Sequence, residues 1–165
     1  MIWRLFTTYL CLIAIFAASP ALANEKGKIP RFASLKSNKV HARAGPGTQY
    51  PIKWVYQKKG LPLEIIYEFE GWRRVRDMKG DKAWVHNTLL SGQRTAIIKA
   101  EKTTALYKRK DLSLPNNKVI ASLAGGLVVR VESCDPKVCE IDAGSAKGYI
   151  KKELLWGIYP NEQIK

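Results

Sequence analysis

The sequence predicts an all-β protein made of two small barrels in tandem. Short runs rich in Val and aromatic residues recur at regular spacing, with Gly, Pro, Asn or Asp between them. This pattern is typical of short strands joined by turns. No window carries apolar residues at helical spacing over three turns. The second half of the chain also echoes the first, so two units of about 60 residues explain the length better than one large core.

The first 23 residues have the features of a signal peptide. Arg4 supplies a positive charge, an apolar stretch follows it, and Ala21-Leu22-Ala23 fits the A-x-A cleavage rule. A retained anchor is the alternative, but the apolar run is too short to span a bilayer comfortably. We therefore expect cleavage after Ala23, a periplasmic or secreted product, and no stable transmembrane anchor.

The remaining chain divides into a lead-in, two barrels and a tail. We expect a flexible lead-in over residues 24–33, a small barrel over 34–93, a second over 94–160 and a tail over 161–165. About five short strands per unit suit a small, strongly bent barrel. In the first unit the predicted strands are 40–43, 52–57, 63–69, 72–76 and 83–86.

The internal repeat is clearest near the end of each unit. AWVHNTLLSG at 83–92 aligns with GYIKKELLWG at 148–157, each closing on Gly. Three further pairs fall in the same order: PIKWVYQ with NKVIASL, GLPLEII with GLVVRVE, and WRRVRDMKGDK with VCEIDAGSAK. A shared order of motifs predicts the same fold twice.

Two cysteines remain after cleavage, in the run CDPKVC. Cys134 and Cys139 form an even pair in an exported protein, and Asp-Pro between them is turn chemistry. We therefore predict a disulfide that closes a hairpin. A zinc site would need two more ligands nearby, and a redox pair is more often C-x-x-C beside a helix. We expect no metal and no cofactor.

The chain is strongly basic, with a net charge of +14. Residues 24–95 hold 15 Lys and Arg against 6 Asp and Glu, while residues 96–165 hold 12 against 8. In an exported protein this charge favours anionic lipid, lipopolysaccharide, cell-wall carboxylates or host glycans over nucleic acid. The alternative is a soluble, positively charged surface with no partner.

The first unit gathers the candidate ligand-binding side chains. ARAGPG at 42–47 reads as a turn rather than a phosphate loop, since Pro46 removes a backbone donor. The functional alternative places Arg43 beside a ligand groove. Arg74 and Arg76 share one strand face and could hold carboxylates, or could simply be solvated. The full candidate set is Arg43, Tyr50, Trp54, Tyr56, Trp72, Arg74, Arg76 and Trp84.

Most aromatic residues of such a small barrel should lie in its core. Tyr50, Tyr56 and Trp72 are nevertheless candidates for an exposed aromatic shelf, which with flanking Arg or Lys would suit peptides, sugars and carboxylates. Catalysis is not expected. His41 and His86 have no neighbouring carboxylate or thiol constellation in the sequence, and neither Gly-x-Ser-x-Gly nor His-Glu-x-x-His occurs.

One ordered string of motifs resembles a known family. SLK-x₃-V-x-A-R-x-GPG-x₂-YP is followed by GLP-L-EI, EGWRRVRD and W-V-H-x₂-LL-S-G-x-R-T-A. This order resembles exported bacterial SH3-like (SH3b) proteins with tandem SH3 repeats, of the alphaproteobacterial type, over about residues 32–160. His41 departs from the family's usual Asn, and YKRKD at 107–111 replaces the first repeat's RAGPG turn.

The resemblance implies SH3-like barrels and a non-enzymatic binding role in the cell envelope. Many such modules recognise peptidoglycan peptides, often beside a hydrolase. The first hypothesis is therefore a cell-wall peptide or a partner protein, bound in a groove lined by aromatic and Arg residues. The alternative is charge-driven binding of anionic lipid, lipopolysaccharide or host glycan through clusters such as Lys58-Lys59 and Lys108-Arg109-Lys110. If either unit binds a ligand through the turn after its first strand, the Gly-Pro-Gly sequence favours the first unit.

Overall fold

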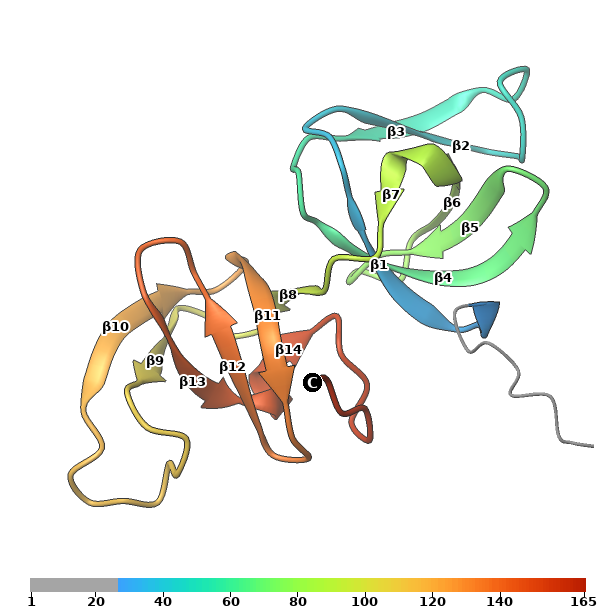
Figure 1. Ribbon diagram of the computed structural model, residues 1–165. Helices are drawn as coiled ribbons and strands as arrows, with labels where there is room; N and C mark the ends of the chain where they lie inside the picture. Colours follow the sequence, from blue (N-terminus) through green and yellow to red (C-terminus); the bar gives the residue numbers. More distant parts are fainter. Residues whose placement is uncertain (1–26) are drawn as a thin grey trace, which may run out of the picture.

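A computed structural model describes residues 27–165, and they form two all-β units in sequence (Figure 1). This confirms the predicted fold class and the tandem arrangement. The predicted signal peptide, 1–23, lies outside the described residues. Within 27–165 no helix is both long and apolar enough to cross a membrane.

The first unit is a seven-stranded antiparallel sheet with the order β3-β2-β6-β5-β4-β1-β7. A one-turn helix, η2 (Asn87–Leu89), precedes the last strand. The strands are β1 (Arg31–Leu35), β2 (Val40–Arg43), β3 (Ile52–Tyr56), β4 (Pro62–Phe69), β5 (Trp72–Arg76), β6 (Lys82–His86) and β7 (Leu90–Ser91).

The second unit has the corresponding strand order, β10-β9-β13-β12-β11-β8-β14. Its one-turn helix is η3 (Lys152–Leu154). The strands are β8 (Thr95–Ile98), β9 (Thr103–Tyr107), β10 (Val119–Ala124), β11 (Val128–Cys134), β12 (Val138–Asp142), β13 (Lys147–Lys151) and β14 (Leu155–Trp156).

The repeat seen in the sequence corresponds to this repeated topology. AWVHNTLLSG spans β6, η2 and β7, and GYIKKELLWG spans β13, η3 and β14. A register shift also recurs, between Ile65 and Tyr67 in β4 and between Val131 and Ser133 in β11. Both units therefore share a β-bulge as well as a strand order.

Each unit has seven strands where about five are expected from the sequence. β1 starts at Arg31, within the segment expected to be a flexible lead-in, and it pairs with both β4 and β7. Strands β7 and β14 have two residues each, too few for a period of two to be visible. The tail is also paired, since the backbones of Ile164 and Cys134 exchange hydrogen bonds of 2.8 and 3.0 Å.

Each barrel closes over its own apolar core. In the first unit Leu35, Leu63, Val75 and Val85 are each at most 1 % exposed. In the second, Ile98, Leu106, Ile141 and Ile150 are also at most 1 % exposed. Alternation along short strands supplies these inward side chains.

Cys134 and Cys139 form the predicted disulfide. They are directly opposite each other on β11 and β12, with Cα atoms 4.1 Å apart. The bond closes the hairpin whose tip is Asp135-Pro136-Lys137, and both cysteines are buried. The alternatives of a zinc ligand pair or a redox pair are therefore not needed to explain this motif.

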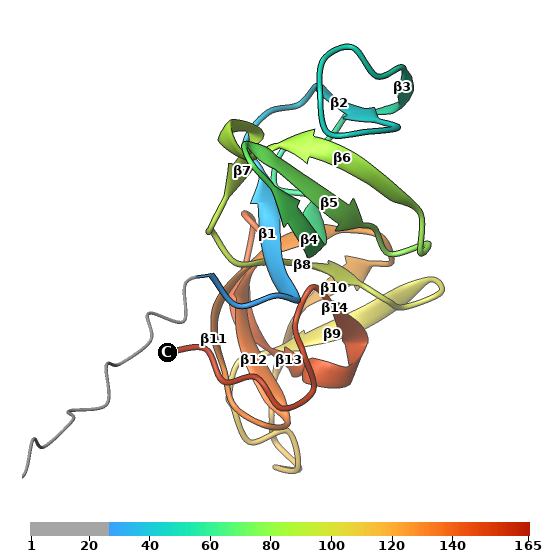
Figure 2. The same ribbon diagram turned by 90° about the vertical axis from the view of Figure 1, so that its right-hand side faces the viewer.

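Figure 2 shows the two barrels one above the other. Polar and aromatic side chains make the contact between them. Ser34 Oγ donates to Gln93 O at 2.5 Å and lies 2.6 Å from Thr95 Oγ1, which in turn donates to Gly60 O at 2.7 Å. Ser34 and Thr95 are both buried. These bonds satisfy the buried hydroxyls of Ser34 and Thr95 where the chain passes between the barrels, while Nε of the adjacent Arg94 is buried without a partner among residues 27–165.

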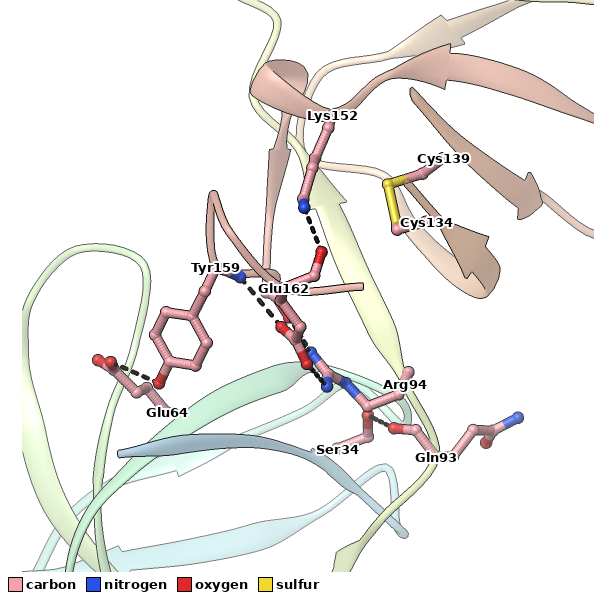
Figure 3. A network of polar contacts seen from close by, with 10 residues as sticks. Ser34, Glu64, Gln93, Arg94, Cys134, Cys139, Lys152, Tyr159 and Glu162 are labelled. Carbon is pink, nitrogen blue, oxygen red and sulfur yellow. Dashed lines mark hydrogen bonds and ion pairs between the residues drawn. A yellow bond between two sulfur atoms is a disulfide. The ribbon is translucent and has the colours of Figure 1, made fainter. Parts of the chain in front are cut away.

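Figure 3 shows a second part of this contact, in which Tyr159 reaches back to the first unit. Its hydroxyl donates to Glu64 Oε1 at 2.9 Å, and its ring lies 4.8 Å from that of Phe32. Arg94 pairs with Glu162 and donates to Gly157 O at 2.9 Å. Burial and the hydrogen bond to Glu64 raise the pKa of Tyr159.

Candidate functional site

One row of side chains crosses the outer face of the first sheet. Arg43 on β2 is opposite Trp84 on β6, Trp84 is opposite Arg74 on β5, and Arg74 is opposite Tyr67 on β4. Directly opposite residues in antiparallel strands project to the same face. With their neighbours two positions along each strand they form the aromatic–arginine face, which consists of Arg43, Tyr67, Phe69, Trp72, Arg74, Arg76 and Trp84.

Tyr67 and Phe69 belong to this face although the sequence did not single them out. Strict alternation from the buried residues Leu63 and Ile65 would turn both aromatic rings inward. The bulge at Ile66 adds one residue and reverses the alternation, leaving Tyr67 54 % and Phe69 46 % exposed. Nothing in the sequence marks this bulge except its recurrence in the second unit.

The three arginines of the face differ in what they contact. Arg43 Nη1 donates to the carbonyls of Thr48 and Tyr50, at 2.9 and 2.7 Å, and so closes the Gly-Pro-Gly turn. Arg76 pairs with the buried Glu64, with Nε donating to Oε2 at 2.7 Å. Arg74 is exposed and forms no hydrogen bond or ion pair with another residue of 27–165. Of these three arginines, only Arg74 has all the N–H groups of its guanidinium available to a ligand.

Two aromatic rings flank Arg74. Tyr67 and Trp84 lie on the strands to either side of it, and their ring centroids are 6.0 Å apart at an interplanar angle of 88°. Such edge-to-face packing holds both rings in place. The arrangement presents an exposed guanidinium on the strand between two aromatic residues whose rings pack on each other, which suits a carboxylate-bearing ligand with an apolar part.

His86 has a structural partner on this face rather than a catalytic one. Its ring packs edge-on to Trp72 with a centroid distance of 5.2 Å, and its Nδ1 is 2.7 Å from Thr88 Oγ1. A Cβ on Gly71 would lie 2.9 Å from His86 Nε2, so glycine allows the hairpin to approach this ring. His41 is exposed on β2, on the strand face opposite to Ala42.

Trp54 and Tyr56, predicted as ligand-binding residues, lie on the inner side of β3. They are opposite the buried residues Ala42 and Val40. Tyr56 is 8 % exposed, so its predicted place on an exposed shelf is wrong, and burial raises the pKa of its hydroxyl. Trp54 packs against the core, with its ring 6.0 Å from that of Tyr56. Tyr56 thus belongs to the core of the first unit, and Trp54 packs against that core.

Tyr50 is exposed but stands apart from the row of strand residues. It is 40 % exposed and its ring covers Gly45, where an added Cβ would meet the ring at 2.4 Å. Tyr50 thus packs on the turn that Arg43 closes from the other side. The predicted candidates Arg43, Trp72, Arg74, Arg76 and Trp84 share the face, whereas Tyr50, Trp54 and Tyr56 do not.

The second unit has a different set of residues in the same row. Tyr107 is opposite Tyr149, Tyr149 is opposite Glu140, and Glu140 is opposite Ser133. Glu140 replaces the arginine at the centre and pairs with Lys147 at 3.3 Å. The second unit therefore lacks the arginines of the row, and only the first unit presents the aromatic–arginine face.

One comparison with known proteins, the match to a family model, agrees with this architecture. A family model described as a bacterial SH3 domain matches residues 36–92 and 114–157. The solved structures of NlpC2 and NlpC1 from Trichomonas vaginalis share 14 % and 13 % identity with the chain, with TM-scores of 0.34 and 0.35. The alignments cover 77 % and 79 % of this chain but 48 % and 46 % of those, so the chain spans about half of their length. No curated protein matches.

The family model matches each barrel once, and the two matches together cover more than half of the chain. It matches the first unit from just after β1 to the end of β7, and the second from the β9–β10 loop to β14. The chain belongs to the bacterial SH3 domain family and carries two such domains in tandem.

Proposed function

We propose that this protein is a non-enzymatic binding module of the cell envelope that recognises peptidoglycan peptide through the aromatic–arginine face of its first domain. Bacterial SH3 domains are typically binding modules and are often associated with the cell wall. The observation that carries the proposal is Arg74, exposed and unpaired on the strand between those of Tyr67 and Trp84, whose rings pack on each other.

The chemistry of a cell-wall peptide matches this face. Such peptides carry carboxylates, which a guanidinium binds through two parallel N–H···O bonds. They also carry short apolar side chains, which pack on aromatic rings. Arg43 and Arg76 are already bonded within the domain, so they hold the face in shape while Arg74 contacts the ligand.

A matched pair of charge reversals tests this proposal against binding by charge alone. Arg74→Glu and Arg109→Glu change the net charge equally, and both residues are exposed. Co-sedimentation with purified peptidoglycan at physiological salt should drop about tenfold for Arg74→Glu, because a charge-assisted bidentate contact is lost and a repulsion added. Arg109→Glu, on the other domain, should behave as the wild type.

Equal losses in the two variants would instead support the charge-driven alternative, in which binding to anionic lipid, lipopolysaccharide or glycan needs no particular arginine. The affinity of such charge-driven binding should also fall steeply between low and physiological salt. A partner protein in place of the peptide would show the same dependence on Arg74 but no sedimentation with peptidoglycan. Loss of sedimentation at moderate salt by the wild type would end the peptide proposal.

A further inference from the structure

The second domain contains a large open cavity that lies apart from the aromatic–arginine face. Its volume is about 1260 Å³, and its walls are the β9–β10 loop, the tip of the disulfide hairpin, η3 and the segment after β14. Its floor is apolar and includes Val138, Leu155 and Ile158. A floor of this kind favours a ligand with a substantial apolar part.

Lysines surround this floor from four separate segments. Lys99 follows β8, Lys110 lies in the β9–β10 loop, Lys137 is on the hairpin tip, and Lys151 and Lys152 lie where β13 meets η3. Three acidic residues also line the cavity, so cations are in excess. Two of those acids are held in hydrogen bonds within their own turns, Asp111 to Ser113 and Asp135 to the backbone of Lys137 and Val138.

Lys152 adds a positive charge that no carboxylate touches. It is 6 % exposed, and its ammonium donates to the carbonyls of Asp135, Pro160 and Glu162. Figure 3 draws the bond to Glu162. The Glu162 carboxylate is used by Arg94 instead. An ammonium group at this position adds to the positive potential of the cavity beside it.

The backbone around the cavity has few groups left for a peptide. The N–H groups of Lys99 and Lys152 donate to the carbonyls of Leu154 and Lys137, each at 2.8 Å. Those of Lys137 and Val138 donate to Asp135 Oδ1 at 2.8 and 2.7 Å. A peptide bound in an extended form needs main-chain partners. The lining of the cavity offers methyl groups and ammonium groups instead of free main-chain groups.

We infer that this cavity binds an anionic single-chain amphiphile, with its alkyl chain on the apolar floor and its carboxylate or phosphate head on the rim lysines. Lys99 and Lys137 form no ion pair within residues 27–165, so they are the two head-group contacts. The site is independent of the proposed peptidoglycan face, which lies in the other domain.

The test measures binding of laurate to the whole mature chain by titration calorimetry below the micelle concentration. Acetate supplies the same head without the chain, and dodecyl maltoside supplies the same chain with an uncharged head. We expect saturable binding of one laurate per chain and much weaker binding of both controls. Lys99→Gln with Lys137→Gln should weaken laurate binding roughly tenfold, since each ion pair contributes up to ~1 kcal/mol.

A matched variant, Lys102→Gln with Lys118→Gln, removes two exposed lysines of the same domain that do not line the cavity, and it should bind laurate normally. Arg74→Glu should also bind laurate normally, so failure of the peptidoglycan proposal leaves this one standing. Equal binding of dodecyl maltoside, equal weakening by both lysine pairs, or tighter binding of a Glu-Leu repeat peptide than of laurate would each overturn the inference.

Discussion

Gly148 lies at a point on β13 where the strand meets β9 too closely for any other residue. A Cβ there would be 2.5 Å from the carbonyl oxygen of Tyr107 and 2.8 Å from Ile120 Cδ1. The repeat aligns Gly148 with Ala83, which is buried in β6 without difficulty. The close approach of the β9 backbone therefore requires glycine at position 148, although the corresponding position of the first repeat holds alanine.

Gly148→Ala should lower the free energy of unfolding by about 1–3 kcal/mol, because a backbone oxygen cannot move aside as a side chain could. Gly92→Ala is the matched control, since no heavy atom lies within 4 Å of the Cβ it would add. Urea unfolding of both variants gives the comparison. A Gly148→Ala protein as stable as Gly92→Ala would show that β9 can shift.

At the scale of single elements, the disulfide hairpin is held by a carboxylate as well as by its covalent bond. Asp135 accepts hydrogen bonds from the N–H groups of Lys137 and Val138 and pairs with Lys110 at 3.0 Å. The backbone hydrogen bonds, followed by the contact with Lys110, lower the pKa of Asp135 to about 2. Asp135 thus joins the hairpin tip to the β9–β10 loop, across the cavity of the second domain.

This lowered pKa predicts acid sensitivity of the hairpin. A carboxyl group whose pKa falls on folding stabilises the fold above its unfolded pKa, near 4, and loses that effect as the pH falls towards 2. Asp135→Asn keeps an acceptor oxygen but cannot titrate. The midpoint of urea unfolding should therefore fall less steeply between pH 4 and pH 2 in Asp135→Asn than in the wild type. Equal slopes would assign the acid sensitivity to other groups, and Glu101→Gln, at an exposed carboxylate, controls for net charge.

The β-bulge in β4 is the element that creates the candidate binding face. Without the extra residue at Ile66, Tyr67 and Phe69 would point into the core beside Leu63 and Ile65. With the bulge, Tyr67 is opposite Arg74 on the outer face, and its ring packs edge-to-face on the ring of Trp84. The bulge in β11 has the same position, but Ser133 follows it there, so the same backbone feature yields no aromatic surface in the second domain.

At the scale of the whole molecule, the two domains are joined by side-chain contacts as well as by the linker. Phe32 of β1 packs against Trp156 and Tyr159, with ring centroids 5.2 and 4.8 Å away. Glu64 accepts from Tyr159 and pairs with Arg76, so one buried carboxylate connects the second domain to the aromatic–arginine face. The segment expected to be a flexible lead-in supplies the aromatic part of this contact.

We expect Phe32→Ala to uncouple the domains. The wild type should unfold in one calorimetric transition, whereas the variant should show two, because each barrel has its own core and Phe32 supplies the aromatic part of the contact that joins them. The loss of stability should stay below the ~3–5 kcal/mol of a fully buried Phe, since Phe32 is half-buried. Phe69→Ala, at an exposed ring of the same domain, should leave a single transition. Two transitions in the wild type would show that the domains are already independent.

The sequence by itself determined the all-β class, the two tandem domains, the disulfide and most of the strands. Period-two alternation, turn residues and paired cysteines are local signals, and the repeat doubles each of them. The same signals placed Arg43, Trp72, Arg74, Arg76 and Trp84 among the candidates for the site. Their common position on one face followed from strand pairing, which the sequence does not show.

Only the tertiary structure decided which of these side chains is available to a ligand. Arg43 and Arg76 are bonded by groups that arrive from other strands and turns, while Arg74 is not. Tyr56 was assigned to an exposed shelf, but the barrel's closure buries it, and one inserted residue turns Tyr67 outward. Exposure depends on long-range pairing and on bulges, and neither leaves a local pattern that a sequence can display.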